Sequence, residues 1–111
     1  MRIALLGGTF NPVHTGHLFL ADEVIAQTDY EHIIFIPTFM PAHKKIVDEI
    51  DPFHRLEMLK VATEPYFGFS VDDCELKRKG TSYMVDTLRE IQNKHTGTEK
   101  IGLIIGDDLA D

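Results

Sequence analysis

The chain alternates short hydrophobic runs with segments of helical periodicity, and this alternation limits the fold more than any other feature. Strands are predicted at residues 2–6, 32–36, 67–76 and 100–105. A segment with helical spacing of its apolar side chains separates each run from the next. Strands that alternate with helices in this way form a parallel sheet joined by right-handed crossovers, with helices on both faces.

The helical segments indicate which side chains face the sheet. In the first, Leu18, Ala21, Val24 and Ile25 recur at helical spacing. In the second, Asp51 and Pro52 are typical of a helix start, and the predicted buried stripe is Phe53, Leu56, Leu59 and Ala62. The third strand carries an acidic cluster that we expect to face solvent, formed by Asp72, Asp73 and Glu75.

Length and charge exclude several classes of protein. A chain of 111 residues is about the size of one domain. Its net charge of -7 argues against broad electrostatic binding to nucleic acid or to anionic membrane. Cys74 is the one cysteine, so no internal disulfide can form, and a reducing compartment is expected. No apolar stretch approaches the roughly 20 residues of a spanning helix, and we expect a cytoplasmic protein.

The segment between the first strand and the first helix carries the clearest chemical signal. It reads GGTFNPVHTGH, from Gly7 to His17. Ligands of open α/β sheets bind beyond the carboxyl ends of the strands, and unpaired backbone amides at a helix start bind phosphate well. His14 and His17 are three residues apart, so both rings can face one side and donate to a phosphoryl group.

Two other interpretations of this histidine pair remain open. One ring can cap the helix or pack within the loop, which is a structural role. Alternatively, His14 and His17 can bind zinc in a metal-dependent hydrolase, although Cys74 is the one thiol and no carboxylate stands beside the pair at ligand spacing.

The same segment resembles the first signature of the (T/H)-x-G-H nucleotidyltransferases. Within that superfamily it looks like the bacterial nicotinate-mononucleotide adenylyltransferases. Further segments are similar to that family in the same order: IPTFMPAHK at 36–44, RLEML at 55–59, GTSYMVDTL at 80–88 and IIGDD at 104–108. The resemblance implies a Rossmann-like open parallel sheet.

The resemblance also implies a reaction, namely transfer of AMP from ATP to nicotinate mononucleotide, with magnesium accompanying ATP. Catalytic roles fall on His14, His17 and Lys44. ATP-binding roles fall on Gly8, Thr9, Phe10, His17, Gly106 and Asp108. Binding of the mononucleotide falls on His43, Ser82, Tyr83 and Met84. No resident metal site is implied.

Some of these residues have a structural alternative. Ser82 is first of all a helix cap, and Asp108 can be one too. Phe10 is expected to contact ligand through its backbone, and Tyr83 to pack its ring in the core.

The chain departs from the family in two places. Met84 stands where the family usually has Thr. The family's second signature, rich in Ser and Thr, would follow Asp111, so we expect residues 1–111 to be one nucleotidyltransferase domain that lacks its C-terminal part. An exposed last strand would favour a homo-oligomer. The alternatives are a catalytically incomplete nucleotide-binding fragment, or another adenylyl- or cytidylyltransferase such as a phosphopantetheine adenylyltransferase.

Overall fold

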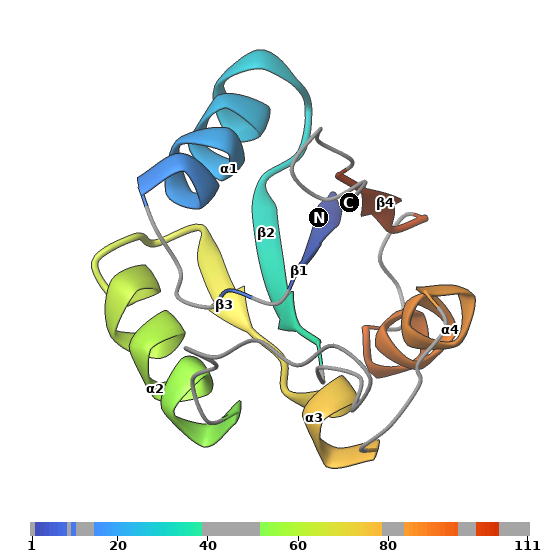
Figure 1. The fold of residues 1–111 in the computed structure, drawn as a ribbon. Coiled ribbons are helices and arrows are strands. Elements are labelled where there is room, and N and C mark those ends of the chain that lie inside the picture. The colour runs from blue at the N-terminus through green and yellow to red at the C-terminus, as the bar shows by residue number, and fades with distance from the viewer. Residues whose placement is uncertain are drawn as a thin grey trace.

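Four parallel strands form the centre of the computed structural model, which describes residues 2–8, 10, 15–38, 52–78, 84–95 and 100–104. The strands are β1 (Ile3–Gly8), β2 (His32–Pro37), β3 (Phe69–Val71) and β4 (Gly102–Leu103). Their order across the sheet is β3-β2-β1-β4, and every neighbouring pair is parallel. The predicted parallel sheet is confirmed (Figure 1).

Helices cover both faces of this sheet. They are α1 (Thr15–Gln27), α2 (Pro52–Thr63), α3 (Cys74–Arg78) and α4 (Met84–Lys94). In Figure 1, α1 and α2 lie on one side of the strands, and α3 and α4 lie on the other. None of the helices in the described part of the chain combines the length and the apolar character needed to cross a membrane.

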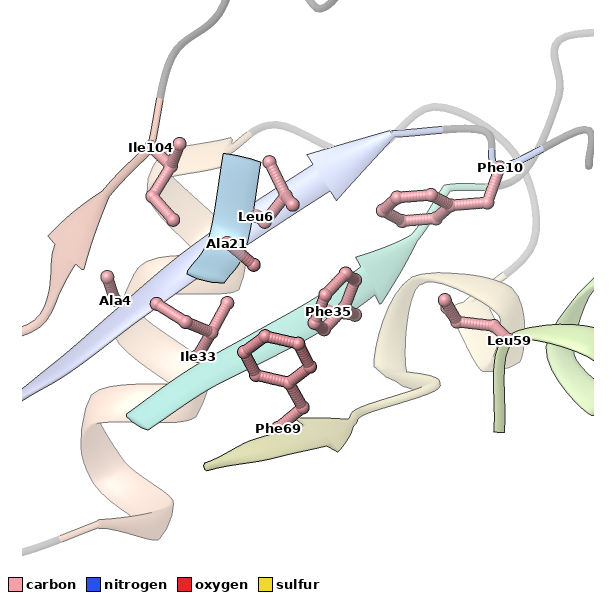
Figure 2. Close-up of a cluster of buried hydrophobic side chains, with 9 residues drawn as sticks. All are labelled: Ala4, Leu6, Phe10, Ala21, Ile33, Phe35, Leu59, Phe69 and Ile104. Carbon is pink, nitrogen blue, oxygen red and sulfur yellow. The ribbon is translucent and has the colours of Figure 1, made fainter. Parts of the chain in front are cut away.

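Alternation along the strands divides the core into two layers. Ala4, Leu6, Ile33 and Phe35 point to the α1–α2 face, where they pack with a cluster drawn in Figure 2. That cluster also contains Phe10, Ala21, Leu59, Phe69 and Ile104. Because successive strand residues face opposite sides, their neighbours supply the second layer. This layer, on the α3–α4 face, contains Ile3, Leu5, Ile34, Ile36, Cys74, Ile91 and Ile101.

The predicted third strand is wrong over much of its length. The strand has three residues, Phe69–Val71, and the chain then forms α3. Asp72 favours the change, because its Oδ1 accepts a 2.9 Å hydrogen bond from the backbone N–H of Cys74, which forms an Asx turn at the start of the helix. Glu75, expected to face solvent, is buried instead.

The predicted stripe of α2 is partly wrong as well. Leu56 and Leu59 are buried, but Phe53 is 68% exposed, and Arg55 is fully buried. Around a helix of about 100° per residue, Arg55 lies roughly 40° from Leu59, whereas Phe53 lies roughly 120° away. The face of α2 centred near Leu59 therefore takes in the arginine and leaves the phenylalanine in solvent.

Candidate active site

The ends of β1 and β2 lie side by side at the carboxyl edge of the sheet. Gly8 pairs with Pro37 in the parallel register, and the N–H of Thr38 donates a 2.9 Å hydrogen bond to the carbonyl of Gly8. In an open parallel sheet this edge is where ligands bind. Gly8, an expected ATP-binding residue, is thus held in place by the first residue after β2.

Phe10 divides its backbone and its side chain between two roles. Its φ is 48°, which lies in the left-handed region that few residues other than glycine adopt. Its ring is 1% exposed and packs against Phe35, with 5.8 Å between ring centroids (Figure 2). Burial of the ring in the core holds the backbone in this costly conformation, and such conformations cluster at functional sites.

His17 lies in the first turn of α1, and its ring meets that of Phe10. The two centroids are 4.8 Å apart, and the ring planes make an angle of 71°, an edge-on contact. The His17 side chain is half-buried, so it is in contact with the core and also with solvent at this edge. The positive end of the α1 dipole lies at the same place, which favours an anionic ligand.

The described part of the chain therefore brings three predicted site residues together, namely Gly8, Phe10 and His17. Met84 begins α4 on the other side of the sheet (Figure 1). The other predicted residues lie outside the described residues: Thr9, His14, His43, Lys44, Ser82, Tyr83, Gly106 and Asp108.

The first half of α4 is tied to α3 by a buried hydrogen bond. Thr87 Oγ1 donates to Glu75 Oε2 at 2.5 Å. The sequence predicts that Glu75 faces solvent and indicates no role for Thr87, although Thr87 lies within the GTSYMVDTL motif at 80–88 that is similar to the family. That motif was the signal that could have identified it.

The last turn of α4 is anchored as well. Lys94 Nζ lies 3.0 Å from Asp72 Oδ2, in the residue pair that joins α4 to the end of β3. Burial by itself raises the pKa of the Asp72 carboxyl, but hydrogen bonds from Lys94 and from the Cys74 backbone outweigh it and lower that pKa. Both ends of α4 are therefore fastened to the segment around α3.

Arg55 is another residue that sequence reasoning missed. It lies on the buried face of α2, and its Nη1 donates a 2.9 Å hydrogen bond to the carbonyl of Thr38. A charged residue inside an otherwise apolar helical stripe was the available signal. Among the described residues, no three His, Cys, Asp or Glu side chains gather as a metal-ligand set.

A parallel α/β sheet with its candidate site at the carboxyl ends of β1 and β2 defines the class of open α/β domains that bind ligand at the strand ends. The chain belongs to the cytidylyltransferase-like family, whose model matches residues 5–111. Nucleotidyltransferases of this family commonly use a divalent metal.

Curated relatives agree with the resemblance found in the sequence. The chain is 47% identical over 109 residues to a probable nicotinate-nucleotide adenylyltransferase of Borreliella burgdorferi, covering 98% of this chain and 56% of the relative. It is 40% identical over 111 residues to the protein of that name from a Geobacter strain, covering 100% and 51%. The resemblance is confirmed, and the chain spans about half the length of the relatives it matches.

A solved structure supports the fold independently. It is the Plasmodium falciparum nicotinic acid mononucleotide adenylyltransferase complexed with NaAD, matched with a TM-score of 0.75 at 18% identity. The match covers 97% of this chain and 53% of that one. The expected Rossmann-like sheet is thereby confirmed.

Proposed function

We propose that this chain forms the nucleotide-binding part of a nicotinate-mononucleotide adenylyltransferase. In the proposed reaction, AMP passes from ATP to nicotinate mononucleotide, giving nicotinate adenine dinucleotide and pyrophosphate. The observation that carries the proposal is the corner at the end of β1, where the Phe10 backbone turns at a positive φ and its buried ring supports His17. The names of the relatives support the choice of substrates.

The chemistry asks little of the protein beyond position and charge. A phosphate oxygen of the mononucleotide forms a bond to the α-phosphorus of ATP, and the bond from that phosphorus to the α–β bridging oxygen breaks, so that this oxygen leaves with pyrophosphate. The enzyme holds both anions in line and stabilises the charge that develops on the transferred group. In this proposal His14, His17 and Lys44 donate to that charge.

Binding roles follow from the same proposal. ATP is held by Gly8, Thr9, Phe10, His17, Gly106 and Asp108, and the mononucleotide by His43, Ser82, Tyr83 and Met84. Magnesium arrives with ATP as part of the substrate and neutralises the leaving pyrophosphate. The domain is residues 1–111, and its expected location is the cytoplasm.

The proposal is tested by measuring pyrophosphate release from the purified chain with magnesium, ATP and nicotinate mononucleotide. We expect release that requires the mononucleotide and is lost in a His17→Ala variant purified in the same way. Calorimetry with a non-hydrolysable ATP analogue on the same samples separates binding from turnover. Binding without release would favour the binding-only alternative, and neither binding nor release would contradict both.

A further inference from the structure

We infer that Arg55 is a positioning residue for the nucleotide site, because it fixes the end of β2 against the end of β1. The effect of Arg55 on nucleotide binding rests on the proposed function. The structural part of the inference, namely that Arg55 holds the end of β2 against the end of β1, does not. Arg55 is fully buried in α2, so it acts through the backbone that it holds.

Thr38 is held from both sides of its backbone. Its carbonyl accepts the 2.9 Å hydrogen bond from Arg55 Nη1, a contact across 17 residues of sequence. Its N–H donates the 2.9 Å hydrogen bond to the carbonyl of Gly8. A continuous line of contacts therefore runs from α2 through the end of β2 to the end of β1.

The residue type at this position indicates a polar role. Leu56 and Leu59 fill the same buried face of α2, where a further apolar side chain would avoid the cost of burying a charge. A guanidinium instead supplies rigid, planar donors that remain charged, and hydrogen bonds from a charged donor are stronger than neutral ones. Orientation of the Thr38 carbonyl is a role that an apolar residue at this position could not fill.

Arg55 affects the candidate site through the end of β1. Phe10 turns away at φ 48° two residues after Gly8, and the ring of His17 rests on the ring of Phe10. The direction in which the chain leaves β1 therefore depends on the hydrogen bond between Gly8 and Thr38. Loss of Arg55 should therefore increase the mobility of the Thr38 backbone and, through that change, weaken nucleotide binding.

Amide hydrogen exchange tests the structural part without any nucleotide. The variants are Arg55→Met, which removes the donors and the charge, and Arg55→Lys, which keeps the charge but replaces the planar guanidinium by an ammonium. The control is Lys60→Met, an exposed basic residue of the same helix. In Arg55→Met we expect the exchange rate of the Thr38 amide to rise about tenfold more than the change in the global free energy of unfolding accounts for. This factor corresponds to ~1.4 kcal/mol in the free energy of local opening. Arg55→Lys should lie between wild type and Arg55→Met, and Lys60→Met should match wild type.

Two outcomes would overturn the structural part. One is an increase in the exchange rate of Thr38 that equals the increase for the slowest-exchanging amides of β1 and β2, because a packing role alone predicts that result. The other is unchanged exchange at Thr38. If Arg55→Met does not fold, the comparison is made on Arg55→Lys, for which the same two outcomes count against positioning.

ATP affinity then tests the link to the site. We expect the Kd for ATP to rise about tenfold in Arg55→Met. In an Arg55→Ala variant, millimolar guanidinium should restore part of the lost affinity. If Arg55→Lys restores affinity while Thr38 still exchanges fast, the charge and not the position of Arg55 matters, and the inference is wrong. Wild-type protein that does not bind ATP would contradict the proposed function, while the exchange result would still decide the structural part.

Discussion

The hydroxyl of Thr87 in α4 donates a 2.5 Å hydrogen bond to the carboxylate of Glu75 in α3, and both side chains are buried. A carboxylate in the interior is costly unless donors satisfy it. The bond also fixes α4 next to α3 one turn after Met84, the residue expected to bind the mononucleotide. Stability and the placement of this part of the proposed site are therefore coupled at Thr87.

Replacement of Thr87 by Val should destabilise the protein by about 1–3 kcal/mol, because Val keeps the shape of Thr but removes the donor to a buried carboxylate. Thr87→Ser retains the hydroxyl and should lose less. The measurement is the free energy of unfolding from urea denaturation. Equal losses in the two variants would show that packing and not the hydrogen bond matters.

Phe10→Ala should cost about 3–5 kcal/mol of unfolding free energy, the usual range for removing a buried aromatic ring. The ring contacts Phe35 and His17 and is almost fully buried. Phe19→Ala is the matched control, since Phe19 of α1 is exposed and its loss should change stability by no more than about 0.5 kcal/mol. A small effect at both positions would contradict a supporting role for the Phe10 ring.

The fold was largely predictable from local patterns where those patterns are unambiguous. Residues 33–36 form an uninterrupted apolar run, and β2 (His32–Pro37) matches the strand predicted at 32–36 with one added residue. Residues 67–76 were ambiguous, because their outcome depends on the Asx turn that Asp72 forms at the start of α3 and on the partner of Glu75 in α4. That partner is 12 residues away, beyond the reach of a local pattern.

The candidate site was likewise predictable only in part. The loop chemistry of residues 7–17 was visible as a motif, and Gly8, Phe10 and His17 do come together. The charge of Arg55 within the α2 segment was a signal, but neither its hydrogen bond to Thr38 nor the burial of the Phe10 ring was predictable, because both depend on which face of a segment meets the sheet. Periodicity in α2 indicates a buried stripe but does not fix its position around the helix axis. The prediction therefore places Phe53 in the buried stripe, whereas the structure buries Arg55.

Stability should fall as the pH is lowered past the ordinary pKa of histidine, and His32 should contribute to that fall. Burial lowers the pKa of His32, and the nearby His95 lowers it further. The folded state thus favours the neutral ring, which is also 2.8 Å from the hydroxyl of Ser70. Its contribution is present above about pH 6.5, the ordinary value, and is lost as the pH falls from there through the lower pKa of the folded state, because the unfolded chain takes up the proton more readily.

The measurement for His32 is the free energy of unfolding at pH 8 and at pH 5.5. In His32→Gln the difference between the two values should be smaller than in wild type. His54→Gln is the control for the loss of an exposed imidazole, since His54 lies exposed on α2. An unaltered pH dependence in His32→Gln would exclude a contribution from this ring.

Gly102→Ala should destabilise the protein by about 1–3 kcal/mol through overpacking. A Cβ at this position in β4 would overlap the phenol of Tyr30, lying 2.5 Å from its Cζ. Movement of the ring away from this Cβ would disturb its contact with the guanidinium of Arg2, whose Cζ lies 5.1 Å from the ring centroid. A double-mutant cycle with Tyr30→Ala checks the cause, since overlap predicts that the second change relieves part of the cost, whereas additive costs would exclude it.

His17→Ala should lower kcat by about 10²–10³-fold in the pyrophosphate-release assay, as expected when one donor to a charged transition state is removed. The edge-on contact with Phe10 also orients the ring, so Phe10→Leu should lower kcat as well, by a smaller factor. His54→Ala is the control for the loss of an exposed imidazole elsewhere. If His17→Ala kept near wild-type turnover while binding ATP normally, His17 would have no part in the chemistry, and the charge on the transferred group would have to be stabilised by other donors.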